Sequence, residues 1–412
     1  MKIAETERKV PVEFGMRSAI PRFFVIALSL STTIAAAQGV ATTPVRARDL
    51  GVPFDGTPGP LNAITDVAGV EVGLTTLIRG EGKLKVGEGP VRTGVTVILP
   101  RGQKNTDPVY AGWFSLNGNG EMTGTTWVEE SGFLAGPVAI TNTHSVGVVR
   151  DSVIAWALQN HLMKEDEWSL PVVAETWDGW LNDINGFHVK QADVLAALDS
   201  AKTGPVAEGN TGGGTGMTCY GFKGGTGSAS RVLTKAEGGY TVGVLVQCNC
   251  GRRPQLTIAG VPVGKEIPGN EPYSEMTHPN ALPGSRSQDD VGSIIIVVAT
   301  DAPLLPNQLK RIARRASLGL ARTGSISGNS SGDIFIAFST ANPHADAEPG
   351  PNTVKTVSNE RISPLFSATV GATEEAIVNA MVGARTMTGV DGRTVIALPH
   401  DKLKQALKKY NR

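Results

Sequence analysis

The sequence predicts an α+β domain built of packed layers. Runs of alternating or β-branched apolar residues predict strands, and apolar stripes at helical spacing predict helices. The two kinds of element follow one another without regular alternation. Regular alternation would instead favour a doubly wound parallel sheet. The chain has 412 residues, 50 of them glycine, which suits one large domain or two ordinary ones with many tight turns.

The N-terminal segment has the composition of a secretory signal peptide. Arg17 and Arg22 precede an apolar run at 23–36, and a small-residue sequence ends at Ala37. The run is too short to be a membrane span. We expect a signal peptide at 1–37, and a periplasmic or secreted protein with no stable membrane span after signal removal. An uncleaved N-terminal anchor is the alternative.

The charge balance and the histidines exclude several classes of function. The formal net charge is zero, which gives no basis for a nucleic-acid partner or for binding to an anionic membrane. The six histidines are scattered singly, and none has the His-x-x-x-His spacing of a metal site. We therefore expect no metal and no cofactor.

The three cysteines, Cys219, Cys248 and Cys250, are too few for a disulfide framework in so long a chain. Cys248 and Cys250 are two residues apart in a predicted strand, so their side chains should point the same way. One disulfide with Cys219 can form in an oxidising compartment. Buried free thiols are the preferred interpretation.

The first half of the chain contains predicted strands, two helices and a glycine-rich block. Residues 38–60 form a polar lead-in, and ordered chain is expected from near Leu61. The elements predicted after it are strands at 70–74 and 95–99, helices at 145–158 and 189–198, and strands at 230–233 and 240–247. The block at 209–216 fails the G-x-G-x-x-G nucleotide-binding pattern because Met217 stands where the third glycine belongs. Turns or close packing are its expected roles.

The second half of the chain begins with a loop of more than forty residues that precedes Ser293. Loops of this length are usually functional or disordered. The elements predicted after it are a strand from Ser293, a helix from near Pro306 to Leu320, a strand at 333–338, a long helix from Ser363 and a helix at 401–410.

A G-x-S-x-G sequence at 328–332 matches the nucleophile elbow of α/β-hydrolases. The elbow needs a strand before it and a helix after it, whereas here a helix precedes and a strand follows. We therefore reject Ser330 as an elbow nucleophile. Ser331 and Asp333 can still be polar supports of a site, and turn chemistry is the alternative.

The stretch at 289–298 is the centre of the functional prediction. A polar loop ends at Gly292, Ser293 follows, and five β-branched residues then predict a buried strand. Taken alone, this stretch favours a loop serine that opens a core strand. The alternative is that the chain cleaves itself between Gly292 and Ser293, so that Ser293 becomes a new N-terminus.

Eight short sequences, in order along the chain, resemble one enzyme family. They are LNAITDV at 61–67, NGNGE at 117–121, TNTHSVG at 141–147, AETWDG at 174–179, GFKGG at 221–225, VQCN at 246–249, GSII at 292–295 and ATDAPL at 299–304. They are similar to the self-processing L-aminopeptidase/D-esterase and β-peptidyl aminopeptidase family. The likeness runs from about residue 61 to the C-terminus.

This resemblance implies a fold and a maturation step. The fold is the four-layer α-β-β-α sandwich of an N-terminal-nucleophile hydrolase, shared with ornithine acetyltransferase-like proteins. One precursor is cleaved between Gly292 and Ser293 into a large subunit, 61–292, and a small subunit, 293–412, of the same domain. The two fragments stay associated, and we expect a homo-oligomer of this heterodimer.

The resemblance also implies catalytic residues. The residue after the cleaved glycine is the nucleophile and corresponds to Ser293. The oxyanion-hole asparagine corresponds to Asn249, and the supporting serine and acidic residue correspond to Ser331 and Asp333. A freed α-amine has a pKa of about 7.7–8.0 against about 10.4 for lysine, so near neutral pH it can take the proton of the serine hydroxyl.

Two further residues are implied in substrate binding. Glu175 corresponds to the acid that holds the free amine of the substrate, and Trp177 lies two residues later. Some members have tyrosine at that position, where a hydroxyl can assist the oxyanion, and tryptophan lacks this oxygen. Members that cleave β-peptides can have tryptophan there, which favours β-aminopeptidase capacity.

The predicted function is that of a self-processing serine aminopeptidase. It releases N-terminal residues from small peptides, amides or esters, with L-amino-acid, D-alanyl or β-amino-acid substrates. One alternative is an acyltransferase of the ornithine acetyltransferase kind, which more typically uses threonine; Ser293 and the export signal argue against it. The other alternative is a catalytically silent binding protein on the same fold.

Overall fold

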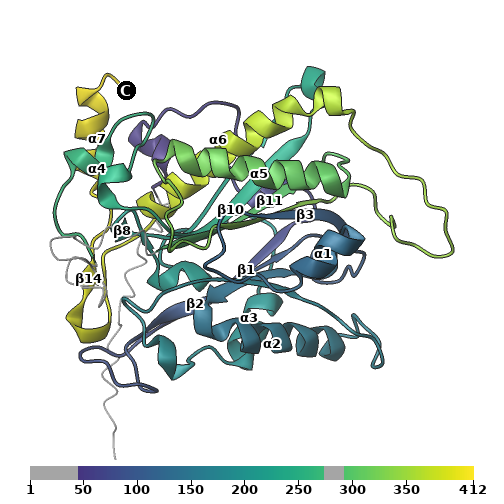
Figure 1. The fold of residues 1–412 in the computed structure, drawn as a ribbon, viewed down its shortest axis with the longest axis horizontal. Coiled ribbons are helices and arrows are strands. Elements are labelled where there is room, and N and C mark those ends of the chain that lie inside the picture. The colour runs from purple at the N-terminus through teal and green to yellow at the C-terminus, as the bar shows by residue number, and fades with distance from the viewer. Residues whose placement is uncertain (1–44, 273–291) are drawn as a thin grey trace, which may run out of the picture. The chain divides into compact units, whose positions relative to one another are not determined.

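Two β-sheets form the centre of the fold in the computed structural model, which describes residues 45–272 and 292–412 (Figure 1). The predicted signal peptide and residues 289–291 of the predicted cleavage stretch lie outside these ranges. The first sheet has the order β1 (Glu71–Arg79), β2 (Val91–Leu99), β5 (Val138–Asn142) and β6 (Val172–Thr176). Only the β5–β6 pair of this sheet is parallel.

The second sheet has six strands. In spatial order they are β4 (Phe133–Leu134), β3 (Val109–Ser115), β12 (Ile334–Ser339), β11 (Ser293–Thr300), β10 (Thr241–Asn249) and β9 (Gly225–Val232). The β11–β12 pair is parallel and the other pairs are antiparallel. The strand that begins at Ser293 therefore lies in the middle of the sheet.

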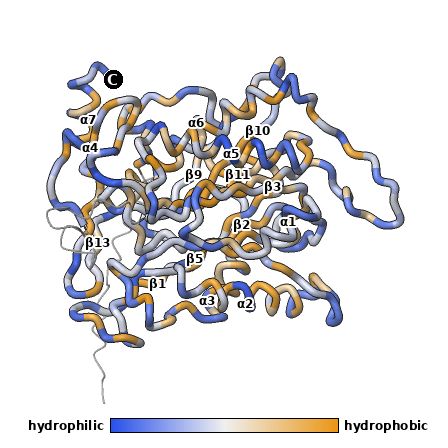
Figure 2. The backbone as a smooth tube through the Cα atoms, in the orientation of Figure 1, coloured by the Kyte–Doolittle hydropathy of each residue, from blue (hydrophilic) through white to orange (hydrophobic). Residues whose placement is uncertain are grey.

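Helices cover the outer face of each sheet. The six-stranded sheet carries α5 (Pro306–Arg322) and α6 (Ser363–Val382), and the four-stranded sheet carries α2 (Val146–Gln159) and α3 (Gln191–Asp199) (Figure 1). The inner faces of the two sheets share one apolar cluster, which includes Ile98, Ile140, Ile295 and Ile336. Figure 2 shows hydrophobic residues concentrated along these strands. The predicted α+β fold class is confirmed.

Smaller elements complete the fold. The helices are α1 (Thr125–Ser131), α4 (Val263–Glu266) and α7 (His400–Lys409), and the strand pairs are β7 (Thr218–Cys219) with β8 (Phe222–Lys223) and β13 (Met387–Thr388) with β14 (Thr394–Val395). None of the helices within 45–272 and 292–412 is both long and apolar enough to cross a membrane.

The predicted strand at 230–233 is too short, because β9 begins at Gly225. Glycine usually weakens a strand, but here it makes room for a helix. A Cβ atom on Gly227 would lie 2.1 Å from the carbonyl oxygen of Ala376 in α6. The glycines of this segment therefore serve close helix–sheet packing, which the sequence pattern alone does not reveal.

The expected start of ordered chain near Leu61 is also wrong. Ala47 and Leu50 are buried in the core cluster beside α6. Arg48 forms a 2.8 Å ion pair with Glu375 of that helix. These apolar and charged contacts hold residues 47–50 of the lead-in against the domain, although the proline and glycine content of the lead-in predicts a loop.

Candidate active site

Ser293 and Asn249 form the end of the β10–β11 ladder. They are directly paired in the antiparallel register, and side chains of paired residues lie on the same face of a sheet. Ser293 is 7% exposed and Asn249 is 1% exposed. The backbone N–H of Gly332 donates a 3.0 Å hydrogen bond to the Ser293 Oγ. Residues from three separate parts of the sequence thus meet at one end of the central strands β10, β11 and β12.

The residue before Ser293 must be glycine. A Cβ atom on Gly292 would lie 2.0 Å from the carbonyl oxygen of Asn249 and 2.8 Å from the Cα of Cys250. Real Cβ atoms do not approach backbone atoms so closely. The Gly292–Ser293 peptide is therefore packed tightly against the end of β10.

Asp333 fixes the start of β11. Its Oδ1 accepts hydrogen bonds from the Ser331 Oγ at 2.7 Å and from the Ile294 backbone N–H at 3.1 Å. The Asp333 backbone N–H donates in turn to the Asn117 Oδ1 at 2.6 Å. The carboxylate is fully buried, so these bonds give it a defined position beside the peptide that follows Ser293.

The loop after β3 links this support to β6 of the four-stranded sheet. The Asn119 Nδ2 donates to the Ser330 carbonyl at 2.7 Å. A Cβ atom on Gly332 would lie 2.3 Å from the Asn119 carbonyl oxygen, so the loop packs directly on the 330–332 segment. A Cβ atom on Gly120 would lie 3.1 Å from the Gly332 Cα and 3.3 Å from the Glu175 Oε1. Gly332 and Gly120 thus separate Ser293 from Glu175.

Glu175 lies near the end of β6 and is 3% exposed. Its Oε1 accepts a 3.0 Å hydrogen bond from the Glu121 backbone N–H, and its Oε2 accepts one from the Thr143 hydroxyl. Burial raises the pKa of the Glu175 carboxyl, and the two hydrogen bonds partly oppose this rise. The arrangement holds a buried, oriented acidic group against the loop at 117–121, which packs on Gly332.

The Asn249 carboxamide has a fixed orientation. Its Oδ1 accepts a 2.8 Å hydrogen bond from the Thr218 backbone N–H, and its Nδ2 donates to the Trp177 carbonyl oxygen at 3.0 Å. A backbone N–H can only donate, so the oxygen of the amide must face Thr218. The bond to Trp177 uses one of the two Nδ2 hydrogens, and a carboxamide has a second one to offer to a developing oxyanion.

The cysteines differ from the expectation of free thiols. Cys219 and Cys248 form a disulfide, and Cys250 is buried outside it, with its Sγ 3.8 Å from that of Cys248. The pairing follows from β7 lying beside β10, which brings the Cα atoms of Cys219 and Cys248 to 5.7 Å, a separation that a disulfide can bridge. All three sulfur atoms lie within 4.8 Å of one another. The disulfide joins the residue after Thr218 to the residue before Asn249, and these two residues are themselves joined by a hydrogen bond.

The structure brings the predicted residues together: Ser293, Asn249, Ser331, Asp333, Glu175 and Trp177 all belong to one connected set of contacts. Four residues that were not predicted from the sequence contact members of this set or support them: Thr143, Thr218, Lys223 and Gly332. Thr143 and Lys223 lie within two of the short sequences that resemble the family, and this is the signal in the sequence that points to them. No pattern in the sequence gives them a role.

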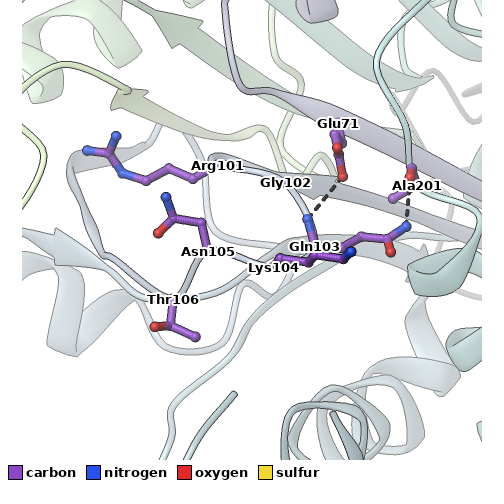
Figure 3. Close-up of a pocket in the computed structure, with 8 residues that line it drawn as sticks. All are labelled: Glu71, Arg101, Gly102, Gln103, Lys104, Asn105, Thr106 and Ala201. Atoms are coloured by element: carbon purple, nitrogen blue, oxygen red, sulfur yellow. Dashed lines mark hydrogen bonds between the residues drawn. The ribbon is translucent and has the colours of Figure 1, made fainter. Parts of the chain in front are cut away.

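Two surface cavities lie away from Ser293. Figure 3 shows one of them, lined by Glu71, Ala201 and the loop 101–106. In it the Gln103 backbone N–H donates to the Glu71 carboxylate at 3.0 Å, and the Gln103 side chain donates to the Ala201 carbonyl at 2.7 Å. The other is adjacent and reaches Trp156 and Trp168. Neither cavity contains a predicted site residue.

Comparisons with known proteins agree on one family. The family model described as peptidase family S58 matches residues 62–395. A β-peptidyl aminopeptidase of Sphingosinicella microcystinivorans is 56% identical over 390 residues, which cover 94% of this chain and 97% of that protein. The chain is therefore similar to this relative over nearly its whole length.

Solved structures give the same result. The L-aminopeptidase D-Ala-esterase/amidase of Ochrobactrum anthropi, a serine aminopeptidase with a variant of the Ntn hydrolase fold, matches with a TM-score of 0.82 at 50% identity. That match covers 90% of this chain and 99% of the other. A β-aminopeptidase of a Burkholderia species matches with a TM-score of 0.78 at 47% identity, over 89% of this chain and 99% of the other.

Proposed function

The chain belongs to peptidase family S58 and is an N-terminal-nucleophile aminopeptidase, and from this premise we propose that Ser293 becomes its nucleophile when the Gly292–Ser293 bond is cleaved. One observation carries the assignment: Ser293 lies directly opposite Asn249 at the end of the central strand pair. Acyl transfer needs a nucleophile and a hydrogen-bond donor for the oxyanion, and this pair can supply both from one face of the sheet.

Self-cleavage begins with attack of the Ser293 Oγ on the Gly292 carbonyl carbon. The C–O bond forms, the C–N bond breaks, and the serine nitrogen takes up the hydroxyl proton as it becomes an amine. Water then hydrolyses the ester, leaving a carboxylate on Gly292 and restoring the hydroxyl. The hydrogen bond from Gly332 to the Oγ supports this step because it holds the hydroxyl in place. The glycine at 292 permits the close approach.

In the mature enzyme the freed amine of Ser293 acts as the base for its own hydroxyl. The Oγ attacks the substrate carbonyl, the Asn249 Nδ2 stabilises the oxyanion, and the amine passes its proton to the leaving group. Water then attacks the acyl-enzyme in the same way, which releases the acyl group as a carboxylic acid and restores the Ser293 hydroxyl. Asp333, with Ser331, keeps the first peptide of the new N-terminus in register through its bond to Ile294.

Glu175 confers the preference for a free N-terminus. Its carboxylate would pair with the substrate ammonium, and the bonds from Thr143 and Glu121 orient it for that contact. Ion pairs with desolvated, hydrogen-bonded groups are among the stronger polar contacts. Substrates with a blocked amine should therefore bind poorly.

We propose that the substrates are small peptides, amides or esters with an N-terminal β-amino acid, an L-amino acid or a D-alanyl group. The relative with 56% identity is a β-peptidyl aminopeptidase, and a solved relative with 50% identity is an L-aminopeptidase D-Ala-esterase/amidase. Trp177 at the position where some members of the family have tyrosine supports β-aminopeptidase capacity.

The fragment that ends at Gly292 and the fragment 293–412 should stay associated after cleavage. The strands β11 and β12 of the smaller fragment lie between β10 and β3 of the larger one, so separation would break the central sheet. We also propose that the heterodimer assembles into a homo-oligomer, since Trp127 and Trp168 form an exposed aromatic pair with ring centroids 5.4 Å apart. Export to the periplasm or the medium follows from the predicted signal peptide.

The assignment of the nucleophile is tested by comparing Ser293→Ala with Ser330→Ala. Ser330 lies in the neighbouring G-x-S-x-G sequence and provides a matched serine control. We expect Ser293→Ala to be uncleaved and inactive, and Ser330→Ala to be cleaved and active. Normal processing of Ser293→Ala would refute the assignment and show that another residue is the nucleophile.

A further inference from the structure

A buried lysine lies behind Asn249 and has no role in the mechanism described above. Lys223 is fully buried. Its Nζ donates hydrogen bonds to the carbonyl oxygens of Met217 at 2.7 Å and Gly224 at 2.9 Å. A charged ammonium is costly to bury without such partners.

The Met217 carbonyl belongs to the same peptide group as the Thr218 N–H. At one end this peptide accepts the hydrogen bond from Lys223, and at the other end it donates the 2.8 Å hydrogen bond to the Asn249 Oδ1. The carbonyl and the N–H of an amide are conjugated. A positive charge at the oxygen therefore makes the N–H a stronger donor, and chains of hydrogen bonds polarise one another in this way.

The Asn249 carboxamide continues the chain. A stronger bond to its Oδ1 makes its Nδ2 a stronger donor by the same conjugation. We propose that Lys223 is a positioning residue for the oxyanion donor: its ammonium, acting through the Met217–Thr218 peptide, orients and polarises the Asn249 carboxamide. This inference rests on the proposed role of Asn249 in the mature enzyme.

The surrounding structure keeps the chain of bonds in place. Thr218 and Lys223 are paired in the β7–β8 hairpin. The disulfide Cys219–Cys248 joins the residue after Thr218 to the residue before Asn249. A Cβ atom on Gly224 would lie 2.4 Å from the Cys248 carbonyl oxygen, so the hairpin packs directly on β10. The distance between the Thr218 N–H and the Asn249 Oδ1 therefore cannot vary freely.

Two opposing effects act on the pKa of Lys223. Burial lowers the pKa of the ammonium to about 7, and the negative charge of Asp178 opposes this shift. Asp178 is itself fully buried, and burial raises the pKa of its carboxyl to about 7. An apolar side chain would fill this space without the cost of burying a charge, so the lysine at this position indicates that its charge has a function.

A purely structural role is the alternative, in which the ammonium only holds the hairpin together. The two roles differ in their dependence on Asn249. If Lys223 acts through the carboxamide, its removal should matter only while the carboxamide is present. If it only stabilises the hairpin, its removal should have the same effect with and without Asn249.

The test is a double-mutant cycle of Lys223→Met with Asn249→Ala, on fully processed protein. We expect Lys223→Met to lower kcat by about tenfold, within the range of coupling between interacting groups, with little change in KM. In the Asn249→Ala background the same substitution should change kcat less than about twofold. Lys223→Gln, which keeps N–H donors but removes the charge, should also lower kcat and show the same dependence on Asn249.

Arg253→Met is the matched control. Arg253 is another buried cation that donates to backbone carbonyls, including those of Tyr220 at 3.0 Å and Ile267 at 3.1 Å. The carbonyls that accept these hydrogen bonds belong to peptide groups other than Met217–Thr218. Any effect of Arg253→Met should therefore be equal in both backgrounds.

The proposal falls if either Lys223 variant keeps the wild-type kcat or loses the same factor in both backgrounds. It falls as well if neither variant accumulates as folded protein, because Lys223 is then a folding residue. A failure of the proposed function is distinguishable, since the wild-type chain would itself be uncleaved or inactive, or Asn249→Ala would keep full activity.

Discussion

The Ser293 Oγ accepts a 3.0 Å hydrogen bond from the backbone N–H of Gly332, which comes from the segment immediately before β12. Because β11 and β12 are parallel neighbours, the segments that precede them lie at the same end of the sheet. Gly332 has no side chain, and so the loop at 117–121 can pack against it and carry contacts on to Glu175. The proposed nucleophile and the proposed amine-binding acid are thus connected through backbone rather than through side chains.

Glu175→Gln should weaken binding of free-amine substrates and leave self-cleavage intact. A hydrogen bond to a charged group contributes about 1.5–3 kcal/mol, so kcat/KM should fall about tenfold to a hundredfold. Steady-state kinetics on an amino-acid amide and intact mass of the same preparation give both readouts. An N-acetylated substrate serves as the control, because it lacks the ammonium. Equal damage to processing and turnover would rule out a role confined to substrate binding.

The acid limb of the pH profile should also report Glu175. Its pKa is raised by burial, so the carboxyl becomes neutral at a higher pH than an exposed glutamate does. A neutral carboxyl cannot pair with the ammonium, and kcat/KM should therefore fall as the pH drops through the raised pKa. In Glu175→Gln the part of the limb due to Glu175 should be missing, whereas the part due to protonation of the Ser293 amine should remain. A limb of the same midpoint in the variant would assign it to another group.

Gly292→Ala should slow or abolish self-cleavage. The added Cβ would lie 2.0 Å from the Asn249 carbonyl oxygen, and so the backbone at the cleavage site would have to move. The fraction of intact chain over time, from mass spectrometry, measures the effect. Gly118→Ala is a nearby control, since a Cβ there has no atom within 4 Å. Wild-type processing of Gly292→Ala would mean that the close packing is not required for cleavage.

The disulfide should stabilise the domain. Replacing both Cys219 and Cys248 by alanine should lower the free energy of unfolding by about 2–4 kcal/mol, which is typical of a native disulfide. Denaturant unfolding monitored by fluorescence measures this change. Cys250→Ala, at the third sulfur of the same cluster, should have a smaller effect because it breaks no covalent bond. Equal midpoints for the double variant and the wild type would contradict a stabilising disulfide.

Long periodic elements were predictable from the sequence. The helices α2, α5 and α6 and the strand β11 follow from apolar spacing and β-branched runs, and the predicted boundaries differ from the observed ones by a few residues. The strands β3, β5 and β6 were missed. The residues of β5 and β6 are buried throughout, so these strands lack the alternation that marks a half-exposed strand.

The residues of the site could be predicted from the sequence, but the hydrogen bonds that connect them could not. The resemblance identifies Ser293, Asn249 and Glu175, and the structure brings them together through elements distant in sequence. The bond from Thr218 to Asn249 depends on a hairpin of two-residue strands, which leaves no periodic pattern. Backbone donors such as the Gly332 N–H carry no sequence signal at all, because every residue except proline has one.

The intact mass of purified, folded wild-type protein shows whether Ser293 becomes an N-terminus. We expect a C-terminal fragment of 120 residues, 293–412, that begins with Ser293 and copurifies with the larger fragment. A single uncleaved chain, or a fragment that begins at any other residue, would contradict the assignment of Ser293 as the N-terminal nucleophile.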